Sequence, residues 1–130
     1  METGHIVFGP LPCGDGRSHA EHPGLVVAVT GNLALVVVGT SQHLPAHPLD
    51  GQIVLQPERG HGADWTALGL NKPTQFDGIG GTVAIVRADK VRVIGHLPHE
   101  PRWTRAMRHV LRAAAANLQA KQQAVAHCRT

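Results

Sequence analysis

The chain has 130 residues, of which 42% are hydrophobic and 16% charged, a size and composition that fit one globular domain and argue against a disordered chain. Its longest wholly apolar run, residues 33–38, is far shorter than the roughly 20 residues that a membrane-spanning helix needs. Residues 1–100 carry six Lys/Arg and nine Asp/Glu, whereas residues 101–130 carry six Lys/Arg and no acid, so attraction for nucleic acid or an acidic partner should centre on the C-terminal segment.

The cysteine content indicates a reducing compartment. Cys13 and Cys128 lie near opposite ends of the chain and are too few for a disulfide framework or a four-ligand zinc motif. The first residues also lack the basic and apolar stretches of a secretory signal. We therefore expect a single domain over residues 1–130 in a cytoplasmic protein, with both thiols reduced.

The N-terminal third is predicted to hold three strands. Residues 5–8 form a β-type run, and the segment 10–23, rich in Gly, Pro, Asp and Ser, is predicted to be a loop. Residues 25–29 and 33–38 are apolar and are separated by the turn residues 30–32. Because neither run alternates with polar residues, we expect a hairpin that is buried on both faces.

Shorter strands are predicted further along the chain, at residues 52–55, 65–70, 82–86 and 91–94, with irregular segments at 57–64 and 73–81. Turn-forming residues separate these runs, and no helical pattern intervenes. Several short strands at this spacing are typical of a small barrel or sandwich. We therefore expect a mainly β fold with one C-terminal helix.

The segment 101–123 has the clearest helical pattern. Pro101 suits a first helical turn, and the carboxylate of Glu100 complements the positive end of the helix dipole. One stripe of this helix is expected to pack on the barrel, and the alternative is that it forms a partner or dimer surface. This apolar stripe consists of Trp103, Met107, Val110, Leu111, Ala114 and Leu118. The opposite face carries Arg102, Arg105, Arg108, His109 and Arg112. This basic face is either simply solvated or contacts nucleic acid or an anionic partner.

The signatures of the common enzyme classes are absent from the sequence. It contains no Walker-type glycine loop, dinucleotide fingerprint, nucleophile elbow or HExxH helix. Two histidine pairs, His19 with His22 and His43 with His47, would bind zinc only if their loops met, and no cysteine or clear carboxylate completes either pair. We therefore expect no metal site.

The order of several short motifs resembles the MazF/PemK toxin family. Gly4-His5-Ile6-Val7 is similar to the first strand of that family, and His22-Pro23 precedes an apolar strand where the family has Arg-Pro. Thr40-Ser41-Gln42 is similar to the family's T-[ST]-Q strand end. Segments 69–77 and 93–98 resemble its second half, so the likeness covers roughly residues 4–120.

This resemblance implies a small SH3-like (MazF/PemK-like) β-barrel over about residues 4–98, a helix over about 101–123, and a homodimer. It also implies a sequence-selective, metal-independent endoribonuclease toxin of a type II toxin–antitoxin system. Single-stranded RNA would be the substrate and a cognate antitoxin the partner, with no cofactor and no membrane. In that family the ribose 2′-hydroxyl attacks the adjacent phosphate, which gives a 2′,3′-cyclic phosphate and a 5′-hydroxyl.

The resemblance further implies that an arginine before the proline of the first long loop and the threonine of T-[ST]-Q act on the phosphate. Thr40 keeps the threonine, but His22 stands where the arginine is expected. Arginine is a permanent cation, whereas histidine titrates near neutral pH. The exchange therefore predicts His22 as general base or acid with Arg17 clamping the phosphate, and it is equally compatible with lost catalysis.

The catalytic candidates are His22, Thr40, Ser41 and Asp77, and the substrate-binding candidates are Arg17, Gln42, His61 and Trp65. The two hydroxyls suit a developing oxyanion, Asp77 or His61 would supply the second proton transfer, and the indole would stack on a base. Plainer alternatives stand beside these roles. The hydroxyls can satisfy backbone groups, the aspartate can form a turn, the loop arginine can be solvated, and the tryptophan can belong to the core.

Three functions are compatible with these observations. The first is a ribonuclease toxin of the MazF/PemK type. The second is a non-catalytic barrel of the same ancestry that binds RNA, DNA or a protein through the arginines of the helix, which the exchange at His22 and the low positive charge of the barrel favour. The third is a structural or dimerisation module, which the low aromatic content of 3% favours, because base-stacking surfaces are aromatic.

Overall fold

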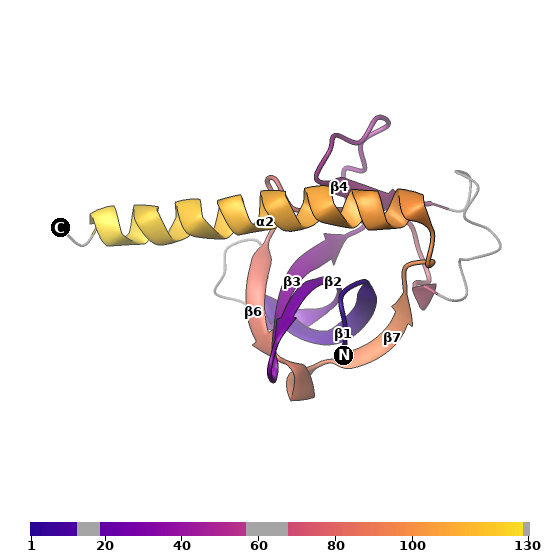
Figure 1. The fold of residues 1–130 in the computed structure, drawn as a ribbon, viewed down its shortest axis with the longest axis horizontal. Coiled ribbons are helices and arrows are strands. Elements are labelled where there is room, and N and C mark those ends of the chain that lie inside the picture. The colour runs from indigo at the N-terminus through magenta and orange to yellow at the C-terminus, as the bar shows by residue number, and fades with distance from the viewer. Residues whose placement is uncertain (13–18, 57–67, 129–130) are drawn as a thin grey trace.

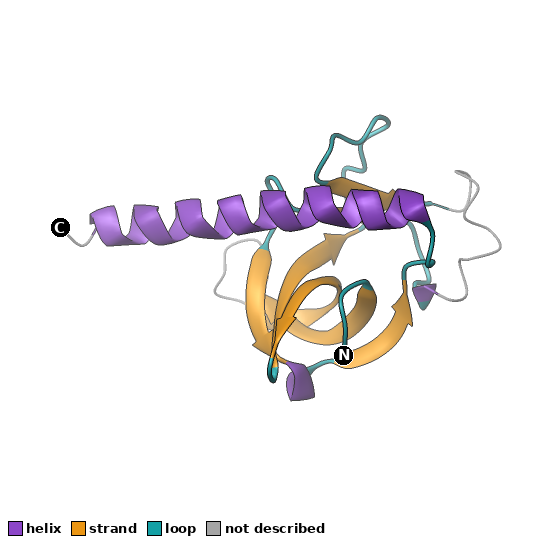
Figure 2. Cartoon of the chain, viewed as in Figure 1, coloured by secondary structure: helices purple, strands orange, loops and turns teal. Residues whose placement is uncertain are grey.

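The computed structural model describes residues 1–12, 19–56 and 68–128, and of residues 19 and 121–128 it describes only the backbone. Its elements are β1 (His5–Pro12), β2 (His19–Thr30), β3 (Leu33–Thr40), β4 (Gln52–Leu55), β5 (Thr74–Asp77), β6 (Val83–Arg87), the 3-10 helix η2 (Ala88–Lys90), β7 (Arg92–His96) and α2 (Pro101–Cys128). Figures 1 and 2 show the strands as a strongly curled sheet with one long helix lying across it.

The strands form a sheet in the order β4-β5-β3-β2-β1-β7, and β6 pairs with β3 beside this path. All of these pairings are antiparallel. The sheet curls into a half-barrel (Figure 1). This confirms the predicted fold class, a mainly β small barrel with a C-terminal helix.

One edge of β3 is shared by two partners. Residues 33–37 pair with β6, whereas Gly39 and Thr40 pair with β5. Between the two pairings, the N–H of Val38 donates to the carbonyl of Thr82 at 2.9 Å. The C-terminal end of β3 therefore lies at a fork, where the strand passes from one neighbour to the other.

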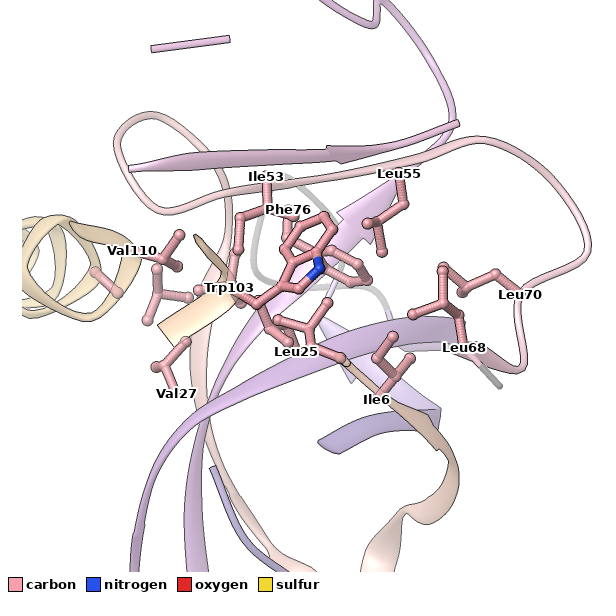
Figure 3. Packing of buried hydrophobic residues seen from close by; sticks show 14 residues of the cluster. Ile6, Leu25, Val27, Ile53, Leu55, Leu68, Leu70, Phe76, Trp103 and Val110 are labelled. Carbon is pink, nitrogen blue, oxygen red and sulfur yellow. The ribbon is translucent and has the colours of Figure 1, made fainter. Parts of the chain in front are cut away.

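Two hydrophobic clusters hold the fold together. The larger packs sheet against helix (Figure 3) and contains Ile6, Leu25, Val27, Val37, Ile53, Leu55, Leu68, Leu70, Phe76, Val83, Leu97, Trp103, Val110 and Ala114. The smaller contains Val7, Leu11, Val26, Ala34 and Val36. Because β2 and β3 send alternate side chains into both clusters, the hairpin is buried on both faces, as predicted.

The apolar stripe of α2 packs on the barrel. Trp103, Val110 and Ala114 are buried in the larger cluster, and Met107 packs against it. Leu111 departs from the prediction, because its side chain remains 38% exposed. The apolar arc that the barrel covers is therefore narrower than the sequence pattern indicates.

The helix begins at Pro101, as predicted, and continues to Cys128, beyond the expected end at residue 123. Its first turn is capped by Glu100, whose carbonyl accepts hydrogen bonds from Trp103 and Thr104 at 3.0 and 3.1 Å. In Figure 1 the C-terminal part of α2 extends past the sheet. No helix in the described ranges is long and apolar enough to cross a membrane.

The predicted loop over residues 10–23 is wrong at both ends. β1 continues to Pro12, and its far half pairs with β2 from His19 onward. β7 pairs only with residues 5–8 of β1, so Pro10 and Pro12 lie where one edge of the strand has no β7 neighbour. Proline is tolerated in such edge positions, where its missing N–H removes no ladder bond.

Two further segments differ from the prediction. The segment 73–81 was expected to be irregular but contains β5, whose four residues all pair with β4. Residues 68–70 of the expected strand 65–70 belong to no strand. The rest of that segment and the predicted loop 57–64 lie outside the described residues.

Candidate functional site

A cleft of about 940 Å³ opens at the fork of β3. Its walls come from β1, β2 and β7, from the end of β3, from β5, and from the segments 69–72 and 80–82. Five candidate residues from three separate parts of the sequence line it: His22, Thr40, Ser41, Gln42 and Asp77. The structure thus brings together every candidate site residue that it describes.

His22 reaches the cleft from a paired strand. The β1–β2 register places it opposite Gly9, next to the Phe8–Pro23 pair, and its side chain is half-buried. The sequence places this histidine in a loop, but the structure holds it in the ladder. A functional group on a strand is positioned more accurately than one on a loop.

The end of β3 forms a short polar turn at the rim of the cleft. The N–H of Gln42 donates to Oγ1 of Thr40 at 3.2 Å, so the hydroxyl satisfies a backbone group, as the plainer interpretation predicts. A hydroxyl that accepts a hydrogen bond still has its own hydrogen to donate. The next residue after Gln42, His43, also lines the cleft and has a φ of 56°, in the left-handed region that most residues avoid. Backbone of this kind is found disproportionately at functional sites.

Asp77 ends β5 and organises the turn that follows. Its Oδ1 accepts hydrogen bonds from the N–H groups of Ile79 and Gly80 at 2.9 and 3.2 Å. The turn-forming role considered for this residue is therefore present in the structure. Both bonds end on Oδ1, and the half-buried carboxylate still lines the cleft.

The cleft also contains charged residues that the sequence did not single out. Lys72 and Arg92 contribute positive charges to its described lining, and Glu21 lies there with Asp77 as a second carboxylate. The guanidinium of Arg92 lies 5.1 Å from the centre of the Phe8 ring, within the range of a cation–π contact. Arg92 belongs to β7, and only the β1–β7 pairing brings it to the site, so no local pattern reveals it.

Gly39 allows the strands to approach each other beside the cleft. A Cβ at this position would lie 2.8 Å from side-chain carbons of both Phe76 and Thr74 and 3.1 Å from Pro23. The two separations of 2.8 Å are shorter than real Cβ contacts, so only glycine fits without a shift of its neighbours. The close packing keeps Thr40, the next residue, at a fixed place in the wall.

Three substrate-binding candidates, Arg17, His61 and Trp65, lie outside the described residues, and the structure does not place them. The same holds for Cys13. Among the residues that the structure does describe, no group of three His, Cys, Asp or Glu side chains is arranged to hold a metal ion.

The basic face of α2 forms a second surface, separate from the cleft. Arg105, Arg108 and Arg112 are exposed, and no described residue of the helix lines the cleft. Arg102 is engaged locally: its Nε lies 2.9 Å from the carboxylate of Glu100, and its guanidinium stacks on Trp103. The cleft and the helix face can therefore be tested independently by substitution.

Comparison with known proteins gives no family assignment. No protein-family profile matches the sequence, and no curated protein matches it either. The resemblance to MazF/PemK toxins therefore remains an expectation from the motifs, and function has to be argued from the cleft.

Proposed function

We propose that the chain is a metal-independent endoribonuclease that cleaves single-stranded RNA in the cleft at the fork of β3. One observation carries the proposal. Candidate residues chosen from motif order alone, spread between His22 and Asp77, line a single cavity. The cytoplasmic location, the homodimer and the cognate antitoxin implied by the MazF/PemK resemblance belong to the same proposal.

In this mechanism His22, in its neutral form, takes the proton from a ribose 2′-hydroxyl. The 2′ oxygen forms a bond to the adjacent phosphorus, and the bond from phosphorus to the 5′ oxygen breaks. The departing 5′ oxygen receives a proton, for which Asp77 and His61 are the two candidate donors. The products are a 2′,3′-cyclic phosphate and a 5′-hydroxyl.

The remaining groups stabilise the charge that develops on the phosphate. The hydroxyls of Thr40 and Ser41 suit this role, because the Thr40 oxygen accepts from Gln42 and leaves its own hydrogen to donate. Arg92 and Lys72 supply positive charge in the cleft, beside the role proposed for Arg17. Gln42 and Trp65 are the proposed base contacts.

The test compares cleavage of a long single-stranded RNA by wild type, His22→Ala and Thr40→Ala, with EDTA present. Loss of a general base or of a transition-state donor is expected to lower the rate by about 100-fold or more. His99→Ala and Thr30→Ala are matched controls, because both residues are exposed and neither lines the cleft. Full activity in both cleft variants would contradict the assignment of the site. A folded wild-type protein that cleaves no RNA would contradict the proposed ribonuclease activity.

A second candidate function is a non-catalytic nucleic-acid-binding barrel. It is favoured by the exposed row Arg105, Arg108 and Arg112, and by the local roles that Thr40 and Asp77 already fill. Replacing the three arginines with glutamine would then abolish nucleic-acid binding, whereas substitutions in the cleft would leave it intact. Binding that does not weaken with salt would contradict this function, because phosphate contacts release counterions.

A further inference from the structure

One polar side chain of the cleft is buried without the partner that it needs. Gln75 of β5 is only 7% exposed, and no donor in the described part of the chain reaches its Oε1. The residue lines the cleft. Buried side-chain oxygens in folded proteins nearly always accept a hydrogen bond, so this one requires an explanation.

The strand register places this amide beside the proposed reaction centre. Gln75 pairs directly with Thr40 across the β3–β5 ladder. Residues directly opposite in an antiparallel pair project from the same face, with Cβ atoms about 5 Å apart. Phe76, the next residue of β5, points the other way into the larger core cluster. The Gln75 side chain therefore lies on the same face of the sheet as the Thr40 hydroxyl.

The neighbouring polar side chains already have partners. Thr74 donates to the carbonyl of Lys72 at 3.0 Å, and Asp77 accepts from two backbone N–H groups. Gln52, on the adjacent strand β4, accepts from the N–H of Leu49 at 3.0 Å. Gln75 thus differs from these neighbours on β4 and β5, because its side-chain oxygen has no hydrogen-bond partner among the described residues. An apolar side chain of the same length would fit the folded chain without the free-energy cost of burying an unpaired oxygen.

We propose that Gln75 is a further base-reading residue of the cleft, and that its Oε1 accepts a hydrogen bond from the exocyclic amino group of a base such as adenine or cytosine. This inference rests on the proposed function, because it takes single-stranded RNA to be the occupant of the cleft. Rotation about the last side-chain torsion of a glutamine meets little resistance, so the oxygen can turn toward a bound base. Glutamine amides are established partners of adenine amino groups in nucleic-acid recognition.

The chemistry of the bases gives the preference its direction. An exocyclic amino group projects beyond the ring and presents two N–H donors to an acceptor at the bottom of a cleft. The N3–H of uracil lies between two carbonyl oxygens, which would approach the Gln75 oxygen together with the donor. Adenine and cytosine should therefore bind better than uracil at the position beside Thr40.

The test measures binding of 2′-O-methyl oligonucleotides of A, C or U by fluorescence anisotropy, since these RNAs lack the attacking hydroxyl. Wild type is compared with Gln75→Met, which keeps the length of the side chain and removes the oxygen. Gln52→Met is the matched control, because Gln52 is a half-buried glutamine of the adjacent strand β4 and does not line the cleft. Gln75→Leu is the second variant if Gln75→Met does not fold.

We expect Gln75→Met to weaken binding of the A and C oligonucleotides by about tenfold and binding of the U oligonucleotide by less than about twofold. Its Tm should equal or exceed that of wild type, whereas Gln52→Met should lower the Tm and leave binding unchanged. If Gln75→Met binds the three oligonucleotides as tightly as wild type does, or if wild type prefers U, the base-reading role alone would be overturned. Wild type that binds none of the three would overturn the proposed function and this inference together.

Discussion

The turn that follows Asp77 is hydrogen-bonded to a side chain of helix α2, and this contact leads to a specific prediction. The side-chain amide nitrogen of Asn117 donates toward three carbonyl oxygens, those of Gly78, Ile79 and Gly81, at 3.3, 3.0 and 3.1 Å. An amide nitrogen carries two hydrogens, so these contacts amount to about two full hydrogen bonds. Asn117→Ala should therefore destabilise the protein.

The magnitude follows from two opposing terms. Loss of about two hydrogen bonds costs about 1–3 kcal/mol in the free energy of unfolding. Alanine has a higher helix propensity than asparagine, which stabilises the folded chain by up to about 0.7 kcal/mol. The expected net loss is about 1–2 kcal/mol, which corresponds to a fall in Tm of roughly 3–10 °C for a chain of this size.

Urea unfolding followed by tryptophan fluorescence measures this change. Asn117→Asp is the sharper variant, because it keeps the shape and directs an oxygen at three carbonyl oxygens, so it should be less stable than Asn117→Ala. Gln119→Ala, an exposed position on the same helix, is the control and should change stability little. If Asn117→Ala is as stable as wild type, or Asn117→Asp is the more stable of the pair, the reasoning is refuted.

Two further predictions concern packing. Gly39→Ala should lose about 1–3 kcal/mol in unfolding free energy, because its Cβ would lie 2.8 Å from Phe76 and Thr74, whereas Gly80→Ala should be mild, with its nearest neighbour at 3.6 Å. Equal stabilities of the two variants would contradict this. Trp103→Ala should lose about 3–5 kcal/mol and Leu111→Ala less than about 1 kcal/mol, because the first side chain is buried and the second is 38% exposed. A larger loss at the leucine would show that the assigned helix face is wrong.

The parts of the fold predicted from sequence are those fixed by local signals. The strand at residues 52–55 matches β4, and Pro101 with Glu100 marks the start of the helix. Segments fixed by pairing were missed. The prolines and glycines of 10–23 favour a loop locally, but β1 and β2 pair through Pro12 and His19. β5 has no run of β-branched residues, and its strand conformation comes from its two neighbours.

The candidate site shows the same division. Motif order selected His22, Thr40 and Asp77, and all three line the cleft. Motif order did not select Arg92 or Gln75. The β1–β7 pairing brings the positive charge of Arg92 to the cleft, and the burial of Gln75 depends on its neighbouring strands β3 and β4. Such properties arise from contacts between distant segments, which no local pattern contains.

The most direct test of the central claim is the chemistry of the RNA ends. The purified protein would be incubated in EDTA with a defined single-stranded RNA and with the same RNA carrying one 2′-deoxy nucleotide at the cut site. We predict cleavage of the first RNA to a 2′,3′-cyclic phosphate and a 5′-hydroxyl, and no cleavage at the substituted position. Cutting of the 2′-deoxy position, or a product with a 5′-phosphate, would contradict attack by the 2′-hydroxyl and with it the proposed role of His22.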